Sequence, residues 1–213
     1  MAVLEERSHL IHQLEQSNNH LETRVAQRTH QLSVANAKLQ ELSVTDGLTQ
    51  CFNRFKLDEV LNDYFSRYHR YQQVFSVILF DIDYFKKVND HYGHLVGDDL
   101  LGGVVRLCQG RLRSMDILGR WGGEEFMIIC PNTSGSEARI LAETLRQLLA
   151  ARYFSPVGHR TASFGVAECQ DKHQAPQDVI RDADEALYQA KAAGRNRTVL
   201  YCNSLNSTDP KSA

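Results

Sequence analysis

A pair of glycines between two apolar runs constrains the fold of this chain more than any other feature. Residues 117–118 precede Gly122-Gly123, and residues 126–130 follow it. Glycine takes a positive φ at little cost, so this pattern predicts a β-hairpin. Glu124 and Glu125 come next and either point to opposite sides of the strand or straddle the turn. Alone, the pattern fits a solvated acidic turn, or a turn that admits a phosphate beside a cation-binding carboxylate.

A second acidic strand end favours the latter interpretation. Residues 74–80 are nearly all apolar, and many are β-branched or aromatic, which predicts a strand buried on both faces. This run ends in Asp81-Ile82-Asp83. Magnesium prefers oxygen ligands and usually keeps waters and substrate phosphates in its octahedron. Carboxylates at the end of a central strand, beside an acidic Gly-Gly hairpin, therefore suit a magnesium site.

The N-terminal stretch has the periodicity of a coiled coil. Residues 4–42 contain no Gly or Pro, and eight of ten positions in strict 3-4 spacing are apolar. The a and d positions are Ile11, Leu14, Asn18, Leu21, Val25, Arg28, Leu32, Ala35, Leu39 and Leu42. Ile and Val at a with Leu at d predict a parallel dimer, in which Asn18 fixes the register. The alternative is a helix packed on its own domain, but a length of roughly 60 Å is too great for that.

Composition excludes several classes of protein. The chain has 213 residues, 42% of them hydrophobic, and a net charge of −2, so it lacks the basic footprint of a nucleic-acid or anionic-membrane binder. Its five cysteines are scattered and lack metal-ligand spacing, which predicts buried thiols in a reducing cytoplasm. No apolar run approaches a membrane span, and no signal-peptide pattern opens the chain. We therefore expect a cytoplasmic protein with no membrane span in this chain.

Several separate motifs between about residues 46 and 201 resemble those of GGDEF/GGEEF-domain diguanylate cyclases. They are DGLT at 46–49, NR at 53–54, DIDYFKKVND at 81–90, GHLVGD at 93–98, GGEEF at 122–126, SFGVA at 163–167 and YQAKAAGRN at 188–196. Gln50 stands where the family usually has glycine. The resemblance implies an α+β palm-like fold related to nucleotide cyclases. Its mixed, mostly antiparallel five-stranded sheet carries flanking helices and follows a long coiled-coil helix.

The expected organisation has three parts. Residues 1–44 form the coiled-coil dimerisation and signalling helix, 45–203 the cyclase domain, and 204–213 a disordered tail. Residues 21–29 also resemble linker helices between sensor and output modules, so the chain is expected to be the output end of a longer, membrane-associated receptor. Thr45 or Asp46 is expected to cap a helix. Within the domain, helices are predicted near 54–69, 137–150 and 177–193, and another ending near 111.

The resemblance implies two magnesium ions per active half-site, with Mn²⁺ as an alternative. Asp81, Glu124 and the backbone carbonyl of Ile82 would bind metal, and Glu125 would hold a second ion. Such ions neutralise a triphosphate and lower the pKa of an attacking 3′-hydroxyl. The family's general base is usually placed at Glu124, a role that competes with metal ligation. Lys86 would stabilise the charge that builds on the phosphate.

The substrate-binding residues implied by the resemblance fall into two groups. Gly122, Gly123, Lys191 and Arg195 would bind phosphates, the glycines through backbone N–H groups. Lys191 and Arg195 are spaced i, i+4, which places them on one face of a helix.

Asn89 and Asp98 would recognise guanine, whose N1–H and 2-amino donors lie side by side and suit a carboxylate. The alternative for Asp98 is a helix cap after Gly97. His94 resembles a substrate-side position, and its alternative is a packed histidine.

Such a site holds one GTP, so joining two GTP molecules into cyclic di-GMP and two pyrophosphates requires a homodimer. The coiled coil would supply the high local concentration of the two domains. Two other functions remain open from the residues. One is a degenerate domain that binds GTP or cyclic di-GMP without turnover, and the other is a dimerisation relay without a ligand. The intact acidic motifs argue against both.

A further motif predicts inhibition by the product. Arg113 and Asp116 fit the family's RxxD inhibitory motif at the family's distance from the glycine pair. The alternative is an exposed turn with an ion pair worth at most about 1 kcal/mol. Family members often supply a second arginine where Thr144 stands here. Arg139 and Arg146 are candidate substitutes, but their helical directions differ.

Overall fold

The computed structural model describes residues 18, 20–25, 27–29, 31 and 44–202. The chain divides into two compact units, Met1–Ser43 and Val44–Ala213. The described residues of the first unit are helical, and Leu21 and Val25 are 55% and 63% exposed in the single chain. The rest of the heptad and the predicted tail lie outside the described residues. The coiled coil therefore stays a prediction.

The second unit is built on a five-stranded sheet with four long helices and one short one. The helices are α2 (Arg54–Tyr71), α3 (Phe85–Tyr92), α4 (His94–Gln109), α5 (Gly135–Ala151) and α6 (Pro176–Ala192). The sheet strands are β1 (Phe75–Ile82), β2 (Ile117–Gly122), β3 (Glu125–Pro131), β6 (Ala162–Glu168) and β7 (Thr198–Leu200). Their order is β2-β3-β1-β6-β7, and only the β6–β7 pairing is parallel. The predicted mixed, mostly antiparallel sheet is confirmed.

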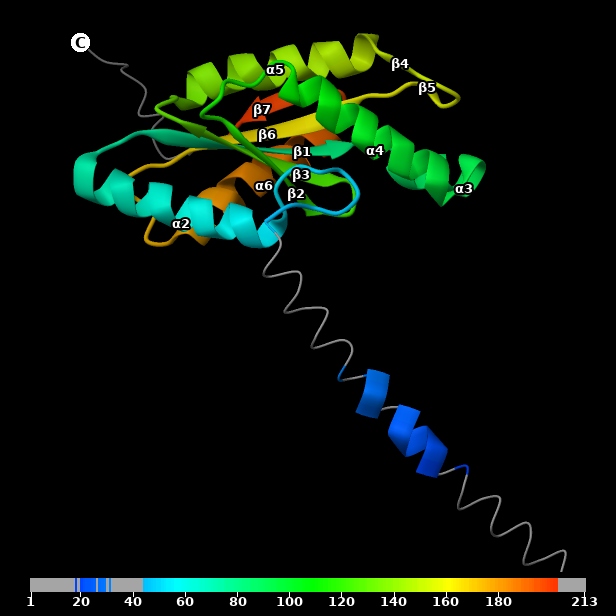
Figure 1. Cartoon of the computed structure of the whole chain (residues 1–213). Coiled ribbons are helices and arrows are strands. Elements are labelled where there is room, and N and C mark those ends of the chain that lie inside the picture. The colour runs from blue at the N-terminus through cyan, green and yellow to red at the C-terminus, as the bar shows by residue number, and fades with distance from the viewer. Residues whose placement is uncertain (1–17, 19, 26, 30, 32–43, 203–213) are drawn as a thin grey trace, which may run out of the picture. The chain divides into compact units, whose positions relative to one another are not determined.

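Helices cover both faces of the sheet (Figure 1). Ile78, Phe80 and Ile82 of β1 pack with α4 and α5 on one face, whereas the alternate residues Val77 and Leu79 pack with α2 and α6 on the other. This alternation follows from the pleat of a strand whose two faces are both buried. Continued for two more residues, it places the Asp81 side chain on the α6 face.

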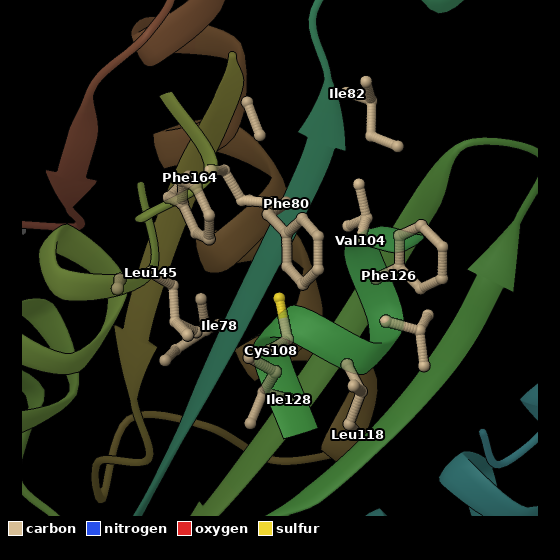
Figure 2. Packing of buried hydrophobic residues seen from close by; sticks show 14 of the residues in the cluster. Ile78, Phe80, Ile82, Val104, Cys108, Leu118, Phe126, Ile128, Leu145 and Phe164 are labelled. Atoms are coloured by element: carbon tan, nitrogen blue, oxygen red, sulfur yellow. The ribbon is translucent and has the colours of Figure 1, made fainter. Parts of the chain in front are cut away.

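Three stacked phenylalanines fix the middle of the sheet directly beside the acidic positions. Phe80 pairs in register with Phe126 and Phe164, and its ring centroid lies 5.2 Å and 4.9 Å from theirs. Figure 2 shows these rings among the aliphatic side chains of the core. Burial of a phenylalanine contributes roughly 1.5–3 kcal/mol, so this stack fixes the register of three strands firmly. Asp81 is the next residue of β1.

Close packing of α6 on the sheet depends on Gly165. A Cβ atom at this position would collide with the backbone of Ala183 and Leu187 in α6. The absence of a side chain lets the helix backbone lie directly on β6. The C-terminal end of α6 is thereby held over the same face that carries Asp81.

Four details differ from the sequence predictions. The helix expected to end near residue 111 is α4, and Gly93, with φ +83, separates it from an additional short helix, α3. A second sheet, β4 (Tyr153–Phe154) and β5 (Gly158–His159), was not anticipated.

Neither Thr45 nor Asp46 caps a helix, because Asn53 is the N-cap of α2. Four cysteines are buried as predicted, but Cys202 is exposed, and all five are unpaired. Within the described part of the chain, no helix is both long enough and apolar enough to span a membrane.

Candidate functional site

A row of polar side chains crosses the centre of the sheet at the end of β1. Asp81 lies directly opposite Glu125 on β3 and opposite Ser163 on β6. Directly opposed residues of antiparallel strands project to the same face, so all three lie on the side of α6. Glu124 occupies the turn next to Glu125. The sheet register thus gathers the carboxylates that the sequence predicted would meet.

Lys191 supplies the counter-charge for Asp81. Its Nζ lies 2.9 Å from Asp81 Oδ2, and the two side chains are 29% and 13% exposed. Burial raises the pKa of Asp81 to about 6. The hydrogen bond and charge of Lys191 partly offset this rise in the pKa, and the charges of Glu124 and Glu125 add to it. Asp81 is therefore a carboxylate that needs a neighbouring cation to stay ionised.

The carboxylates fit an ion that brings part of its own coordination shell. In the described residues, no group of three His, Cys, Asp or Glu side chains forms a closed metal cage. Magnesium is usually bound by one or two carboxylates together with waters and substrate phosphates, and it needs no such cage. A lysine amine already stands beside Asp81 as a cation. Asp81, Glu124 and Glu125 thus fit a magnesium site that is completed by substrate.

Asp83 is a buried carboxylate to which the sequence pattern assigns no role. It accepts hydrogen bonds from Thr161 Oγ1 at 2.6 Å, Ser163 Oγ at 2.7 Å and the backbone N–H of Asn196 at 3.1 Å. These bonds join the end of β1, the start of β6 and the loop after α6. Asp83 therefore fixes these three segments relative to one another. Its position two residues after Asp81, on the same face, was the available signal.

The glycine turn has open space around it, and a hydrogen bond from Arg120 supports it. Gly123 has φ +51, and a Cβ built on Gly122 or Gly123 would meet no atom within 4 Å. Arg120 donates through Nε to the Gly123 carbonyl at 2.8 Å and forms an ion pair with Asp46 at 3.3 Å. Backbone N–H groups in an open glycine turn can receive phosphate oxygens.

Asp46 links this turn to the segment at the start of the second unit. It accepts from the Thr49 backbone at 2.8 Å and from the Thr49 hydroxyl at 2.6 Å. Burial raises the pKa of Asp46, but the bonds from Thr49 and the charge of Arg120 outweigh it, so the pKa lies below its usual value. Asp46 of the DGLT motif thus supports the glycine turn through Arg120.

The proposed base-recognition residues lie on α3 and α4. The carboxamide of Asn89 lies against Gly97, and the Asn89 Oδ1 atom is buried without a hydrogen-bond partner in the described part of the chain. Asp98 is the fifth residue of α4, so the alternative that it caps that helix is wrong. His94 is exposed, so the alternative of a packed histidine is also wrong.

The basic residues come from three different segments. Lys86 lies near the start of α3 and is exposed. Lys191 lies in the last turn of α6, whereas Arg195 lies beyond the end of that helix with φ +62. The prediction that Lys191 and Arg195 share a helical face is therefore wrong. The loop nonetheless brings Arg195 to Tyr84, with Cζ 4.7 Å from the ring centroid.

The RxxD motif forms a tight turn just before β2. Asp116 Oδ2 accepts from the backbone N–H of Arg113 at 2.8 Å, and the two residues make no ion pair with each other. The motif helps to line a cleft of about 390 Å³, together with loop residues that include Gln50 and Phe52. The alternative interpretation, an exposed turn with an Arg–Asp ion pair, is therefore wrong about the ion pair.

Arg146, one candidate substitute for the missing second arginine, is bound to Glu143 and Asn196. Its guanidinium makes two hydrogen bonds to Glu143, at 2.6 Å and 2.9 Å, and one to Asn196 Oδ1 at 2.7 Å. The bonds from Arg146 lower the pKa of Glu143 to about 2. Arg139 is exposed on the same helix.

Residues 43–197 match the family described as diguanylate cyclase, GGDEF domain. A diguanylate cyclase of Vibrio cholerae is 39% identical over 165 residues, which are 77% of this chain and 51% of that protein. The response regulator PleD of Caulobacter vibrioides is 37% identical over 164 residues, which are 75% and 36% of the two chains. This chain thus spans about half the length of these curated relatives, or less.

Solved structures agree with this assignment. The active GGEEF domain of a Vibrio cholerae diguanylate cyclase has a TM-score of 0.69 and 39% identity, and the match covers 72% of this chain and 99% of that one. The coiled coil and GGDEF domain of DgcB from Caulobacter crescentus, in complex with c-di-GMP, has a TM-score of 0.72 and 29% identity. That match covers 84% of this chain and 98% of DgcB's. The chain belongs to the GGDEF-domain family of diguanylate cyclases, and its domain has the palm-like α+β fold of that family.

Proposed function

We propose that this chain condenses two GTP molecules into cyclic di-GMP and two pyrophosphates. The observation that carries the proposal is the meeting of Asp81 and Glu125 on adjacent strands, beside an open glycine turn, with Lys191 as their counter-charge. A negatively charged centre next to an open glycine turn suits a metal–triphosphate complex. Membership of the family supports the same reaction.

The metal site is proposed to consist of Asp81, Glu124, Glu125 and the Ile82 carbonyl. Bound Mg²⁺ would neutralise the triphosphate and lower the pKa of the 3′-hydroxyl that attacks the α-phosphorus of the other GTP. Lys86, Lys191 and Arg195 would bind the phosphates and stabilise the charge that develops as pyrophosphate leaves. In this proposal Lys191 transfers from Asp81 to a phosphate oxygen when the substrate arrives.

Guanine recognition is proposed for Asn89 and Asp98. Guanine offers two adjacent donors to a carboxylate, and adenine does not. Asn89 Oδ1 lacks a donor in the described part of the chain, and a buried acceptor in that state costs about 1–3 kcal/mol. A ligand that completes the hydrogen bonds of the Asn89 carboxamide would recover part of this energy. Asp98→Ala should raise the KM for GTP, and equal turnover of ATP and GTP by the native chain would contradict this assignment.

The reaction is proposed to take place between two copies of the chain, since each site holds one GTP. Exposed Leu21 and Val25 occupy heptad positions, which supports a parallel coiled coil as the dimer contact. Deleting residues 1–42 should lower the specific activity most at low protein concentration. A native chain that light scattering shows to be monomeric at micromolar concentration, yet fully active, would contradict this arrangement.

Cyclic di-GMP is proposed to inhibit the enzyme at Arg113 and Asp116. The Arg113 guanidinium has no ion-pair partner in the described residues and lies at a cleft, where its planar fork suits a phosphate or a guanine edge. Because Thr144 replaces a second arginine and Arg146 is bound to Glu143, the inhibition should be weaker than in members with both arginines.

The direct test is incubation of the purified chain with GTP and Mg²⁺, followed by mass analysis of the products. Cyclic di-GMP together with pyrophosphate is the expected result. If GTP binds but is returned unchanged, the chain is a nucleotide-binding module instead. If it does not bind GTP at all, the site assignment fails together with the reaction.

A further inference from the structure

Tyr84 lies at the edge of the site in a conformation that a tyrosine rarely takes. It is the N-cap of α3, with φ 59 and ψ 29, and it is 54% exposed. The left-handed region costs a residue with a side chain roughly 1–2 kcal/mol. Asp83, the residue before it, is buried and bonded to three other groups. The fixed backbone at Asp83 therefore directs Tyr84 outward at the point where β1 ends.

Two basic side chains meet the ring of Tyr84. Lys87 Nζ and Arg195 Cζ each lie 4.7 Å from its ring centroid. Lys87 belongs to α3, whereas Arg195 belongs to the loop between α6 and β7, so the ring joins two segments that are far apart in sequence. The hydroxyl group of Tyr84 makes no hydrogen bond within the described residues. The aromatic face, not the hydroxyl, is the part of this side chain that makes contacts.

The backbone that carries Arg195 is held in place on the same side. Gly194, Arg195 and Asn196 all have positive φ, at 109, 62 and 45 respectively. The Asn196 N–H donates to Asp83 at 3.1 Å, and the Asn196 side chain accepts from Arg146 at 2.7 Å. These bonds place the start of the Arg195 side chain beside Tyr84. The contact with the ring then sets the position of its guanidinium.

We propose that Tyr84 is a positioning residue that holds Arg195 ready for the terminal phosphates of GTP. The inference rests on the proposed function, since it assumes that Arg195 binds those phosphates. A carboxylate could also orient Arg195, but it would neutralise the charge and compete with phosphate. An aromatic face attracts a guanidinium through its quadrupole and leaves the N–H donors free for a bidentate contact. The ring thus orders Arg195 and keeps its charge available.

The first test measures binding without turnover. Calorimetric titration with pyrophosphate and Mg²⁺ should show about three- to tenfold weaker binding to Tyr84→Leu than to the native chain. Titration with GMP, which lacks the terminal phosphates, should be unchanged. Tyr84→Phe keeps the ring and should restore pyrophosphate binding. Tyr71→Leu removes another exposed tyrosine that contacts an arginine, and it should have no effect.

The second test is a double-mutant cycle with Arg195→Ala. If the ring acts through Arg195, Tyr84→Leu should have no further effect once the guanidinium is gone. The KM for GTP should rise in Tyr84→Leu more than kcat falls. An equal loss of pyrophosphate binding in the Arg195→Ala background would overturn the proposal, and so would equal losses for GMP and pyrophosphate. The titrations remain decisive even if no cyclic di-GMP is formed, so a failure of the proposed function is distinguishable.

Discussion

Lys191 stands beside Asp81 where a metal ion is proposed to bind, so removing its charge should strengthen metal binding. In the ligand-free chain a cation must displace the amine from Asp81 Oδ2, which lies 2.9 Å away. We predict that Lys191→Met binds Mg²⁺ or Mn²⁺ more tightly than the native chain in the absence of nucleotide. Its GTP turnover should fall, because the same amine is proposed to bind phosphate.

The expected size follows from the geometry of this ion pair. The side chains of Lys191 and Asp81 are only 29% and 13% exposed, so water screens the pair weakly. A hydrogen bond between charged groups in such a setting contributes about 1.5–3 kcal/mol. Each 1.4 kcal/mol is a factor of ten in affinity. At a pH well above the raised pKa of Asp81, where this carboxyl stays ionised without the amine, the metal Kd of Lys191→Met should therefore be about ten- to a hundredfold lower than that of the native chain.

Isothermal titration calorimetry of the nucleotide-free protein with Mn²⁺ is the appropriate assay. Lys191→Arg keeps a cation near Asp81 and should stay close to the native Kd. Lys86→Met removes a lysine that is exposed and has no ion-pair partner among the described residues, and it should change the Kd little. A Kd that does not decrease in Lys191→Met, or a decrease of the same size in Lys86→Met, would refute the reasoning.

Three further predictions concern the base pocket, the acidic centre and the inhibitory turn. Gly97→Ala should displace the Asn89 carboxamide and raise the KM for GTP about five- to thirtyfold with little loss of stability, since alanine also favours the helix. Gly47→Ala, at an open turn position, is the matched control, and a KM unchanged by Gly97→Ala would remove the assignment. Because burial raises the pKa of Asp81 to about 6, the unfolded chain loses this proton first as the pH rises from about 4, and the native chain loses stability in that window. Measured by denaturation, the free energy of unfolding of Asp81→Asn relative to that of the native chain should therefore rise by about 2–3 kcal/mol between about pH 4 and pH 6.5 and then stay constant. A difference in unfolding free energy that does not change with pH would contradict the raised pKa. Arg113→Ala should abolish the slowing of turnover as cyclic di-GMP accumulates, without lowering the initial rate, and identical slowing in both proteins would exclude the RxxD site.

The central hairpin and its acidic strand ends could be predicted from the sequence because the signals are local. An apolar run of strand length, a glycine pair and the alternation of the pleat suffice to place Asp81 and Glu125 on adjacent strands. Register then decides which carboxylates meet. The stack of Phe80 with Phe126 and Phe164 sets that register. The acidic strand ends were thus predictable from the residues, whereas the folded register shows that Glu125 is the one opposite Asp81.

Backbone conformations that depend on tertiary contacts were not available in the same way. Gln50 stands where the family usually has glycine, and its φ of +60 explains that preference. Its side chain donates to the Gly47 carbonyl at 2.8 Å, which offsets part of the strain. Tyr84 and Arg195 also have positive φ, and neither position is marked by glycine. Spacing alone therefore placed Arg195 wrongly on a helical face.

The sequence pattern also cannot distinguish the roles of the two aspartates in the DIDYF segment. Asp81 and Asp83 are indistinguishable by residue type, and a continued strand alternation would place both on one face. Their difference comes from residues about 80 and 110 positions later in the chain: Asp83 is bonded to Ser163 and Asn196, whereas Asp81 faces Lys191. Sequence pattern identifies such a pair of acids, but only the folded contacts separate the structural one from the one available to a metal.

The most direct test of the central claim compares the native chain with Asp81→Asn and Glu124→Gln in one product assay. Each purified protein is incubated with GTP and Mg²⁺, and cyclic di-GMP and pyrophosphate are quantified together, with folding checked by thermal denaturation. The native chain should release two pyrophosphates for each cyclic di-GMP formed, and both folded variants should form neither product. Near-native synthesis by either variant would contradict the acidic centre as the site of the reaction.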